Sequence, residues 1–266
     1  MKKRIISIFV LLIIFIPLLI IGGLPFSCLM AITGVLGIRE LFKVREEKKK
    51  FPVFLTLVAY CTVIYLTCTP SEIGNLSFLL DYRFLAFLLF TFLIPIVIID
   101  DNKKYNLNDS LFLLGSTLFI GLSFNLIVMI RDYSLQYILF LFVITSFTDV
   151  FAYIGGNLIG KHKLSPNISP KKTVEGLIVG TLMGVIAASI FYLEVINPNI
   201  SVIILLIVTI TLSLTGQLGD LVFSAIKRYY NKKDFSNLIP GHGGILDRLD
   251  SIIFVALAAV IFLAII

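Results

Sequence analysis

The residues best suited to polar chemistry gather between Ser224 and Asp250, close to the C-terminus. This stretch holds five lysines and arginines, one of only two histidines in the chain, and the glycine-rich run Gly241–Gly244. Most of the remaining chain is apolar. Because charged groups are costly in a bilayer and mark functional positions there, such a concentration of acids, bases and glycines indicates chemistry on a polar substrate.

Two aspartates are expected to meet at this stretch. If the chain before it is helical, Asp220, Ser224 and Lys227 share one helix face at positions i, i+4 and i+7. On the next apolar segment, Asp247 and Asp250 share a face at positions i and i+3. Carboxylates that converge from two helices beside basic residues suit Mg²⁺, which prefers one or two carboxylates plus substrate phosphates to a closed protein cage.

The histidine of this stretch, His242, lies between glycines. No second histidine or cysteine is near it in the sequence, so the ligand set of a zinc site is missing. We therefore expect His242 to order the glycine-rich loop or to contact phosphate.

A lone carboxylate, Asp149, lies inside the apolar run 141–156. A charged residue at the centre of a membrane helix costs about 2.5–3.5 kcal/mol on insertion scales, so it normally faces a cavity or a partner. We expect a functional carboxylate near the cytoplasmic end of its helix. The alternative is an acid that only packs between helices, hydrogen-bonded to a neighbouring threonine or serine.

The segment 165–176 contains two Ser-Pro steps, which favour a stiff, extended loop. Lys171 and Lys172 precede a helix expected to start near Thr173, with Ser169 or Thr173 as its cap. Exposed helix N–H groups beside two lysines form an anion site. The alternative is an ordinary capped helix with lysines at the membrane interface.

The run Gly155–His162 nearly fits the phosphate loop G-x-x-x-x-G-K-[ST], with His162 in place of the hydroxyl residue. A phosphate loop follows a strand and needs the hydroxyl for magnesium, whereas a membrane helix precedes this run. We expect its glycines to allow close helix packing and to end the helix instead.

The composition is that of an integral membrane protein. The chain has 266 residues, 58% of them hydrophobic and 14% charged, against about 45–50% and about 25% in soluble proteins. We expect an all-α, polytopic helical bundle that forms a single membrane domain over residues 1–266. Nine apolar segments are expected to span the bilayer, at about 5–21, 24–38, 53–69, 83–99, 110–130, 135–155, 174–194, 199–221 and 249–266.

The basic residues are distributed unequally between the two sides. With nine crossings, the side of the N-terminus receives 20 of the 22 lysines and arginines, and the other side receives only Arg83 and Arg131. The positive-inside rule makes the first side cytoplasmic. The net charge of +6 therefore reflects membrane orientation, and no nucleic-acid partner is expected. The first two segments, joined by Gly22-Gly23-Leu24-Pro25, could be two spans or a re-entrant hairpin.

Two segments of the sequence resemble those of a known enzyme family. Ser224–Arg228, Lys233-Asp234 and Pro240–Asp250 together resemble the signature of the phosphatidate cytidylyltransferases, also called CDP-diacylglycerol synthases. The segment Asp149–Gly176, in particular GKHKLSPNISPKKTVEG, is also similar to the family. The resemblance covers a catalytic region at residues 145–251. The helices of residues 1–140 match the family only in being hydrophobic.

The resemblance implies transfer of CMP from CTP to phosphatidic acid, with Mg²⁺, giving CDP-diacylglycerol and pyrophosphate for phospholipid biosynthesis. The family pattern places metal binding on Asp220 and Asp247, and we expect Asp149 and Asp250 to support that metal site. The remaining expected site residues bind triphosphate and lipid phosphate or form the substrate pocket: Lys171, Lys172, Ser224, Lys227, Arg228, His242, Gly243, Gly244 and Arg248.

The expected partners are CTP, phosphatidic acid, the lipid bilayer and a second copy of the chain, and the expected location is the plasma (inner) membrane with the site at its cytoplasmic face. Potassium as a second cation stays open, as do the acyl-chain preference and the use of dCTP. A CTP-dependent lipid-alcohol kinase would release CDP instead of pyrophosphate. An ion-coupled transporter would use Asp149 as its coupling acid, but transporters commonly show internal repeats and this sequence has none.

Overall fold

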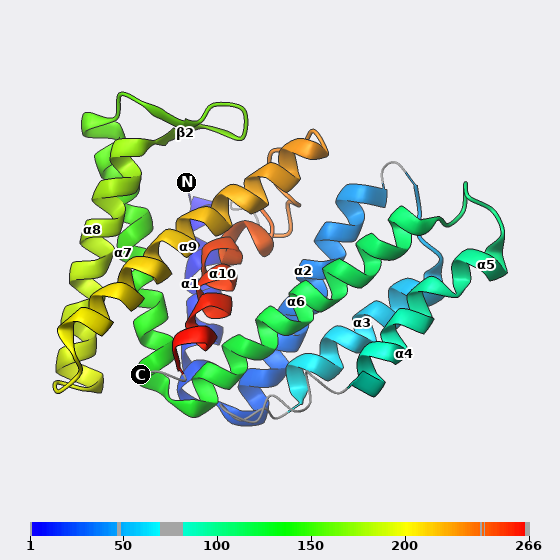
Figure 1. The fold of residues 1–266 in the computed structure, drawn as a ribbon, viewed down its shortest axis with the longest axis horizontal. Coiled ribbons are helices and arrows are strands. Elements are labelled where there is room, and N and C mark those ends of the chain that lie inside the picture. Colours follow the sequence, from blue (N-terminus) through cyan, green and yellow to red (C-terminus); the bar gives the residue numbers. More distant parts are fainter. Residues whose placement is uncertain (1, 47–48, 70–81, 240, 242, 264–266) are drawn as a thin grey trace. The chain divides into compact units, whose positions relative to one another are not determined.

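The computed structural model describes residues 2–46, 49–69, 82–239, 241 and 243–263. Over these residues the chain is all-α except for one short hairpin (Figure 1). The helices are α1 (Lys2–Ile21), α2 (Gly23–Glu46), α3 (Val53–Cys68), α4 (Tyr82–Leu93), α5 (Pro95–Ile99), α6 (Leu107–Tyr133), α7 (Leu135–Ile159), α8 (Val174–Phe191), the π-helical turn η2 (Tyr192–Ile196), α9 (Val202–Tyr229) and α10 (Leu246–Leu263).

The chain divides into two compact units. The first consists of Met1–Met129 and Phe235–Ile245, and the second of Ile130–Asp234 and Leu246–Ile266. The segment Phe235–Ile245 therefore packs with the N-terminal helices, although it lies late in the sequence. The expectation of one membrane domain over the whole chain stays a prediction.

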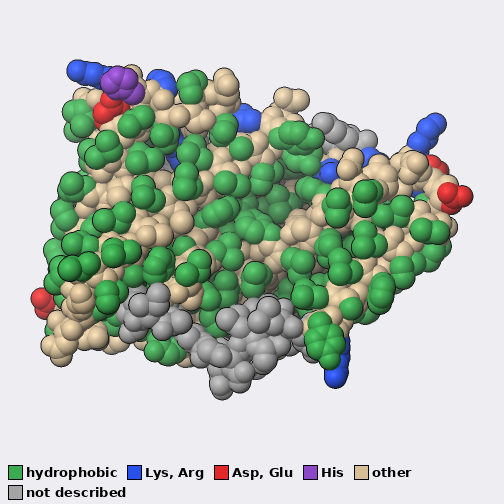
Figure 2. Space-filling view, viewed as in Figure 1, with side chains coloured by type: hydrophobic (Ala, Val, Ile, Leu, Met, Phe, Trp, Pro, Cys, Tyr) green, Lys and Arg blue, Asp and Glu red, His purple; other side chains and the backbone are tan. Residues whose placement is uncertain are grey.

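Among the residues that the structure describes, six helical segments are long and apolar enough to cross a membrane: Gly23–Arg45, Tyr82–Ile99, Leu107–Tyr133, Leu135–Ile159, Val174–Ile196 and Val202–Tyr229. The segment Leu11–Ile21 of α1 and helix α3 are apolar but shorter. Helix α10 carries three charged residues among its 18. The protein is thus a multi-pass membrane protein, and Figure 2 shows hydrophobic side chains over most of the visible face of its helices.

The helix boundaries differ from the expected segments in two informative places. The segment expected at 83–99 is broken between α4 and α5, because Pro95 cannot donate the backbone hydrogen bond that would continue the helix. The segment expected to end at 221 continues as α9 to Tyr229. Hydropathy falls after residue 221, but the backbone stays helical.

In the second unit, α7 and α8 pack closely along a glycine stripe. A Cβ added at Gly176 would lie 2.6 Å from the carbonyl oxygen of Ala152, and one at Gly180 would lie 2.7 Å from that of Thr148. Only glycine permits backbones to approach this closely. The opposite side of α8 presents exposed aliphatic side chains at Ile178, Leu182, Ile186 and Ile190, as expected of a face toward lipid.

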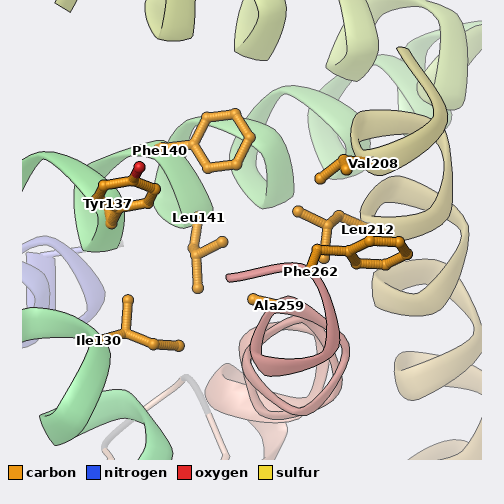
Figure 3. Close-up of a pocket in the computed structure, with 8 residues that line it drawn as sticks. All are labelled: Ile130, Tyr137, Phe140, Leu141, Val208, Leu212, Ala259 and Phe262. Carbon is orange, nitrogen blue, oxygen red and sulfur yellow. The ribbon is translucent and has the colours of Figure 1, made fainter. Parts of the chain in front are cut away.

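The interior of the second unit is densely packed where α7, α9 and α10 meet. Figure 3 shows side chains of these helices and Ile130 directed at one another. They enclose an apolar cavity of only about 10 Å³, enough for no more than one water molecule. The residues around it are Ile130, Tyr137, Phe140, Leu141, Val208, Leu212, Ala259 and Phe262.

The first unit holds a buried ion cluster under aromatic side chains. Asp109, at the start of α6, pairs with Arg45 at 2.5 Å and also with Lys49. The Arg45 guanidinium lies 4.7 Å from the ring centroid of Phe112, and the Phe112 ring stacks on that of Phe51. Two cations thus neutralise a carboxylate that is almost completely buried.

The segment expected to be an extended loop forms a hairpin that joins α7 to α8. Strand β1 (Lys163–Ser165) pairs antiparallel with strand β2 (Ser169–Thr173). Thr173, one of the two expected caps, accepts a hydrogen bond from the Gly176 amide at 3.1 Å, so the prediction of this cap is confirmed. Gly160 follows α7 at its C-terminal end, as expected for the glycine-rich run.

Candidate active site

A cavity of about 810 Å³ opens within the second unit, where α7, the hairpin, α8, α9 and α10 meet. Its size is within the range of about 300–1,000 Å³ that is usual for small-molecule sites. Its lining combines charged groups with helix backbone: Asp149, Ala152, Tyr153, Gly156, Asn157, Gly160, Lys163, Leu164, Lys171, Lys172, Thr173, Gly176, Leu177, Gln217, Asp220, Lys227, Asp234, Asp247, Arg248, Asp250 and Ser251.

All four aspartates singled out in the sequence line this cavity. Asp149 comes from α7, Asp220 from α9, and Asp247 and Asp250 from the first turns of α10. The expected convergence of carboxylates from different helices is therefore present, and Asp149 lines the cavity together with Ser251.

Asp220 is held by groups from two elements. Its Oδ2 lies 2.7 Å from the Lys172 Nζ of strand β2, and its Oδ1 accepts a hydrogen bond from Ser224, one helical turn later, at 3.3 Å. The Lys172 ammonium also donates to the carbonyl oxygen of Gln217 at 3.4 Å. Lys172 and Asp220 remain partly exposed to the cavity, so both can reach a ligand there.

Asp247 forms the most buried ion pair of the cavity wall. Its Oδ1 accepts a hydrogen bond from the Lys227 Nζ at 2.7 Å, and the two side chains are only 5% and 10% exposed. The pair joins the end of α9 to the start of α10. Asp247 also stands in the first turn of its helix, where the dipole favours a negative charge.

Other predicted residues occupy different positions. Lys171 and Arg248 line the cavity with exposed side chains. Arg228 is absent from its lining: its Nε donates to the carbonyl oxygen of Ile168 at 3.2 Å, and a terminal nitrogen donates to that of Lys232 at 2.9 Å. In this structure Arg228 ties the hairpin turn to the end of α9.

The glycine-rich loop is described only in part. The prediction for His242 lies outside the described residues. Gly243 and Gly244 belong to the segment Phe235–Ile245 of the first unit, where Gly244 lies against the carboxylate of Glu40. Their predicted contact with substrate stays a prediction.

Sequence reasoning did not single out three polar residues of the lining. Gln217 donates to the Thr181 hydroxyl at 2.9 Å, and Lys163 and Asp234 come from the hairpin and from the chain after α9. Gln217 could have been noticed as a polar residue of an apolar helix, three positions before Asp220. Lys163 and Asp234 lie within the segments that resemble the family, but neither was assigned a role there.

The carboxylates fit a hard divalent cation by their chemistry. Carboxylate oxygens are preferred ligands of Mg²⁺, which needs only one or two of them when substrate phosphates supply the rest. Among the described residues, no three acidic, histidine or cysteine side chains form a closed metal cage. An open site with Asp220 and Asp247 as ligands stays a prediction.

Glu175 organises the entrance to α8. Its carboxylate accepts hydrogen bonds from the backbone amides of Lys161 and His162, at 3.0 and 3.2 Å, and lies 2.6 Å from the His162 Nδ1. The carboxylate thus closes the base of the hairpin. His162 stands where a phosphate loop would have serine or threonine, and its side chain is paired with Glu175.

Comparison with known proteins agrees with this geometry. The profile of the cytidylyltransferase family matches residues 2–266. A phosphatidate cytidylyltransferase of Bacillus subtilis is 37% identical over 264 residues, which cover 96% of this chain and 94% of that protein. Those of Staphylococcus saprophyticus and Staphylococcus aureus are each 36% identical over 96% of both chains. The chain therefore belongs to the phosphatidate cytidylyltransferase family.

Proposed function

We propose that the cavity of the second unit transfers the CMP group of CTP to phosphatidic acid, which yields CDP-diacylglycerol and pyrophosphate for phospholipid biosynthesis. The observation that carries this proposal is the gathering of five carboxylates, four lysines and one arginine around one cavity in a multi-pass membrane protein. The names of the relatives supply the substrates. A cavity at the end of membrane helices is accessible to a soluble nucleotide and to a lipid headgroup.

In the proposed reaction, a phosphate oxygen of phosphatidic acid forms a bond to the α-phosphorus of CTP. The bond between this phosphorus and the oxygen that bridges to the β-phosphorus breaks, and pyrophosphate leaves with its electron pair. No residue has to act as a general base, because a phosphate dianion is already a nucleophile. Catalysis then consists of positioning and of charge stabilisation, as in other phosphoryl transfers.

The basic residues of the lining divide this work by position. Lys171 and Arg248, which are exposed to the cavity, can bind phosphate oxygens directly. Lys172 and Lys227 hold Asp220 and Asp247 in place and face the same cavity. Arg228 does not line the cavity, but it supports the site indirectly through its hydrogen bond to Ile168 in the hairpin turn.

Magnesium is part of the proposal. Asp220 and Asp247 would hold the ion, with Asp149 and Asp250 supporting it, and bound Mg²⁺ would neutralise developing charge on the phosphates. The protein's own contribution is the open carboxylate pair and the lysines beside it. Potassium as a second cation stays open.

We also propose that the protein lies in the plasma (inner) membrane. It would cross this membrane nine times, with its N-terminus in the cytoplasm. The concentration of lysines and arginines in the loops of one side supports this orientation. The cavity lies at the ends of α7 and α9 that lead into these expected cytoplasmic loops. A cytoplasmic site has direct access to CTP. We also propose a homodimer, on the resemblance alone.

The test is turnover of the purified protein in detergent with phosphatidic acid, radiolabelled CTP and Mg²⁺. Label carried from cytidine into a lipid product, release of pyrophosphate, and loss of both with EDTA are the expected results. Restoration by added Mg²⁺ is the control. Release of CDP with a lipid alcohol as acceptor would instead establish the kinase reaction, and an absence of CTP binding would refute a nucleotide site.

A further inference from the structure

A buried carboxylate of the first unit lies outside every role given so far. Glu40, on α2, is only 4% exposed. Its Oε1 accepts a hydrogen bond from the Ser236 hydroxyl at 2.6 Å and another from the backbone amide of Ile245 at 2.9 Å. Both donors come from the segment Phe235–Ile245 and lie 196 and 205 residues later in the chain, so the carboxylate bridges two distant parts of the sequence.

The described part of this segment is built around the Glu40 side chain. A Cβ added at Gly244 would lie 2.5 Å from each Glu40 carboxylate oxygen, so only glycine leaves room for them. The Ile239 amide donates to the Gly243 carbonyl oxygen at 2.9 Å, which closes a narrow turn. Gly243 has φ +85°, a conformation that other residues rarely adopt.

The buried carboxylate of Glu40 has a hydrogen-bonding role that an apolar side chain of similar size could not fill. Burial of a charged group is unfavourable unless hydrogen bonds compensate it, and an apolar side chain would avoid the cost. An apolar side chain would, however, leave the buried Ile245 amide without this acceptor, and such an unsatisfied group is itself destabilising. The carboxylate therefore fixes the backbone at Ile245.

We propose that Glu40 is a positioning residue of the catalytic reaction, which sets the backbone that leads into α10. Ile245 is followed directly by Leu246 and Asp247, so the anchored amide is two residues from the proposed metal ligand. This gives α2 of the first unit a positioning role, although the sequence of the N-terminal segments suggested only apolar spans. The inference rests on the proposed function for its kinetic part, but the anchor itself can be measured without activity.

The experiment compares wild type, Glu40→Ala, Glu40→Gln and Glu40→Asp as full-length proteins in detergent. Glu194→Ala is the control, because Glu194 is an exposed glutamate of η2. Amide hydrogen exchange of the peptide containing Ile245 reports the anchor, and kcat and KM for CTP report its effect on the site. Thermal unfolding of each variant is recorded alongside.

We expect faster exchange at the Ile245 peptide and a kcat lower by about 10–100-fold in Glu40→Ala, which is the usual effect of losing a group that orients a ligand. Glu40→Gln keeps an oxygen that can accept both hydrogen bonds, so it should restore protection and most of kcat. Glu40→Asp keeps the charge but is one methylene shorter, so it should behave like Glu40→Ala. Glu194→Ala should match wild type.

Wild-type exchange and kinetics in Glu40→Ala would overturn the inference, and so would faster exchange with unchanged kcat and KM. If Glu40→Ala does not fold, Glu40→Asp is compared with Glu40→Gln. Equal kcat in these two variants would refute the inference, because only the longer glutamine side chain should reach the Ser236 and Ile245 donors. An inactive wild type would refute the proposed function, whereas the exchange data would still test the anchor.

Discussion

The Lys227–Asp247 pair offers the sharpest test of the site, because its structural and catalytic roles can be separated. The two side chains are 10% and 5% exposed and lie 2.7 Å apart, so solvent screens their interaction little. Removal of one partner from such a buried pair costs about 3–5 kcal/mol, since it leaves an uncompensated charge. Lys227→Met and Asp247→Asn should each reduce stability by this amount.

The double variant Lys227→Met/Asp247→Asn should be more stable than the two single changes predict. It removes both charges of the pair together, so we expect at least half of the loss to be recovered. At roughly 2–4 °C per kcal/mol for a chain of this size, the single variants should unfold about 6–20 °C below wild type. Thermal unfolding in detergent measures all four corners of this double-mutant cycle.

Turnover should behave differently from stability. If Asp247 holds the magnesium ion, the double variant should be as inactive as Asp247→Asn, although its fold is recovered. CMP transfer measured at a temperature well below the unfolding midpoints of wild type and of the double variant separates the two effects. Additive stability losses would show that the ion pair contributes no coupling, and near-normal turnover in Asp247→Asn would refute the metal assignment.

Two further predictions concern the neighbouring elements. Lys172→Gln should cost about 1 kcal/mol or less, because its pair with Asp220 is partly exposed, yet it should lower turnover strongly; unchanged kcat/KM would contradict a role in the site. Gly180→Ala should lower the unfolding temperature in detergent by an overpacking cost of about 1–3 kcal/mol, since the new Cβ would lie 2.7 Å from the Thr148 carbonyl oxygen. Gly115→Ala is the matched control, because a Cβ there meets nothing within 4 Å, and equal effects of the two changes would argue against close α7–α8 packing.

The sequence predicted the elements of the second unit well, because apolar runs and helical spacing are local properties. Helix positions were enough to predict that Asp220 and Asp247 come close together, and both line one cavity. The cap at Thr173 followed from its residue type and from its position before an apolar run. These inferences need no knowledge of tertiary contacts.

What the sequence could not predict depends on contacts between distant segments. The hairpin around residues 163–173 has strands of three and five residues, too short for an alternating pattern to be recognised. Lys172 and Lys227 were expected to bind phosphate, but their pairing with particular aspartates is a tertiary property. The role of Glu40 could not be predicted, because its helix has several other charged residues at the same end. Its partners Ser236 and Ile245 are about 200 residues away in the sequence.

The glycine stripe between α7 and α8 has a consequence for biogenesis. A helix that enters the bilayer alone with Asp149 in its interior has to expose that carboxylate to lipid, at a cost of about 2.5–3.5 kcal/mol if the residue is at the centre. The two helices are consecutive and are joined by a short polar hairpin, so they can enter the membrane together, already packed backbone to backbone. The small residues that bring the helices together can thus also let α7 and α8 leave the translocation machinery as one packed helical hairpin.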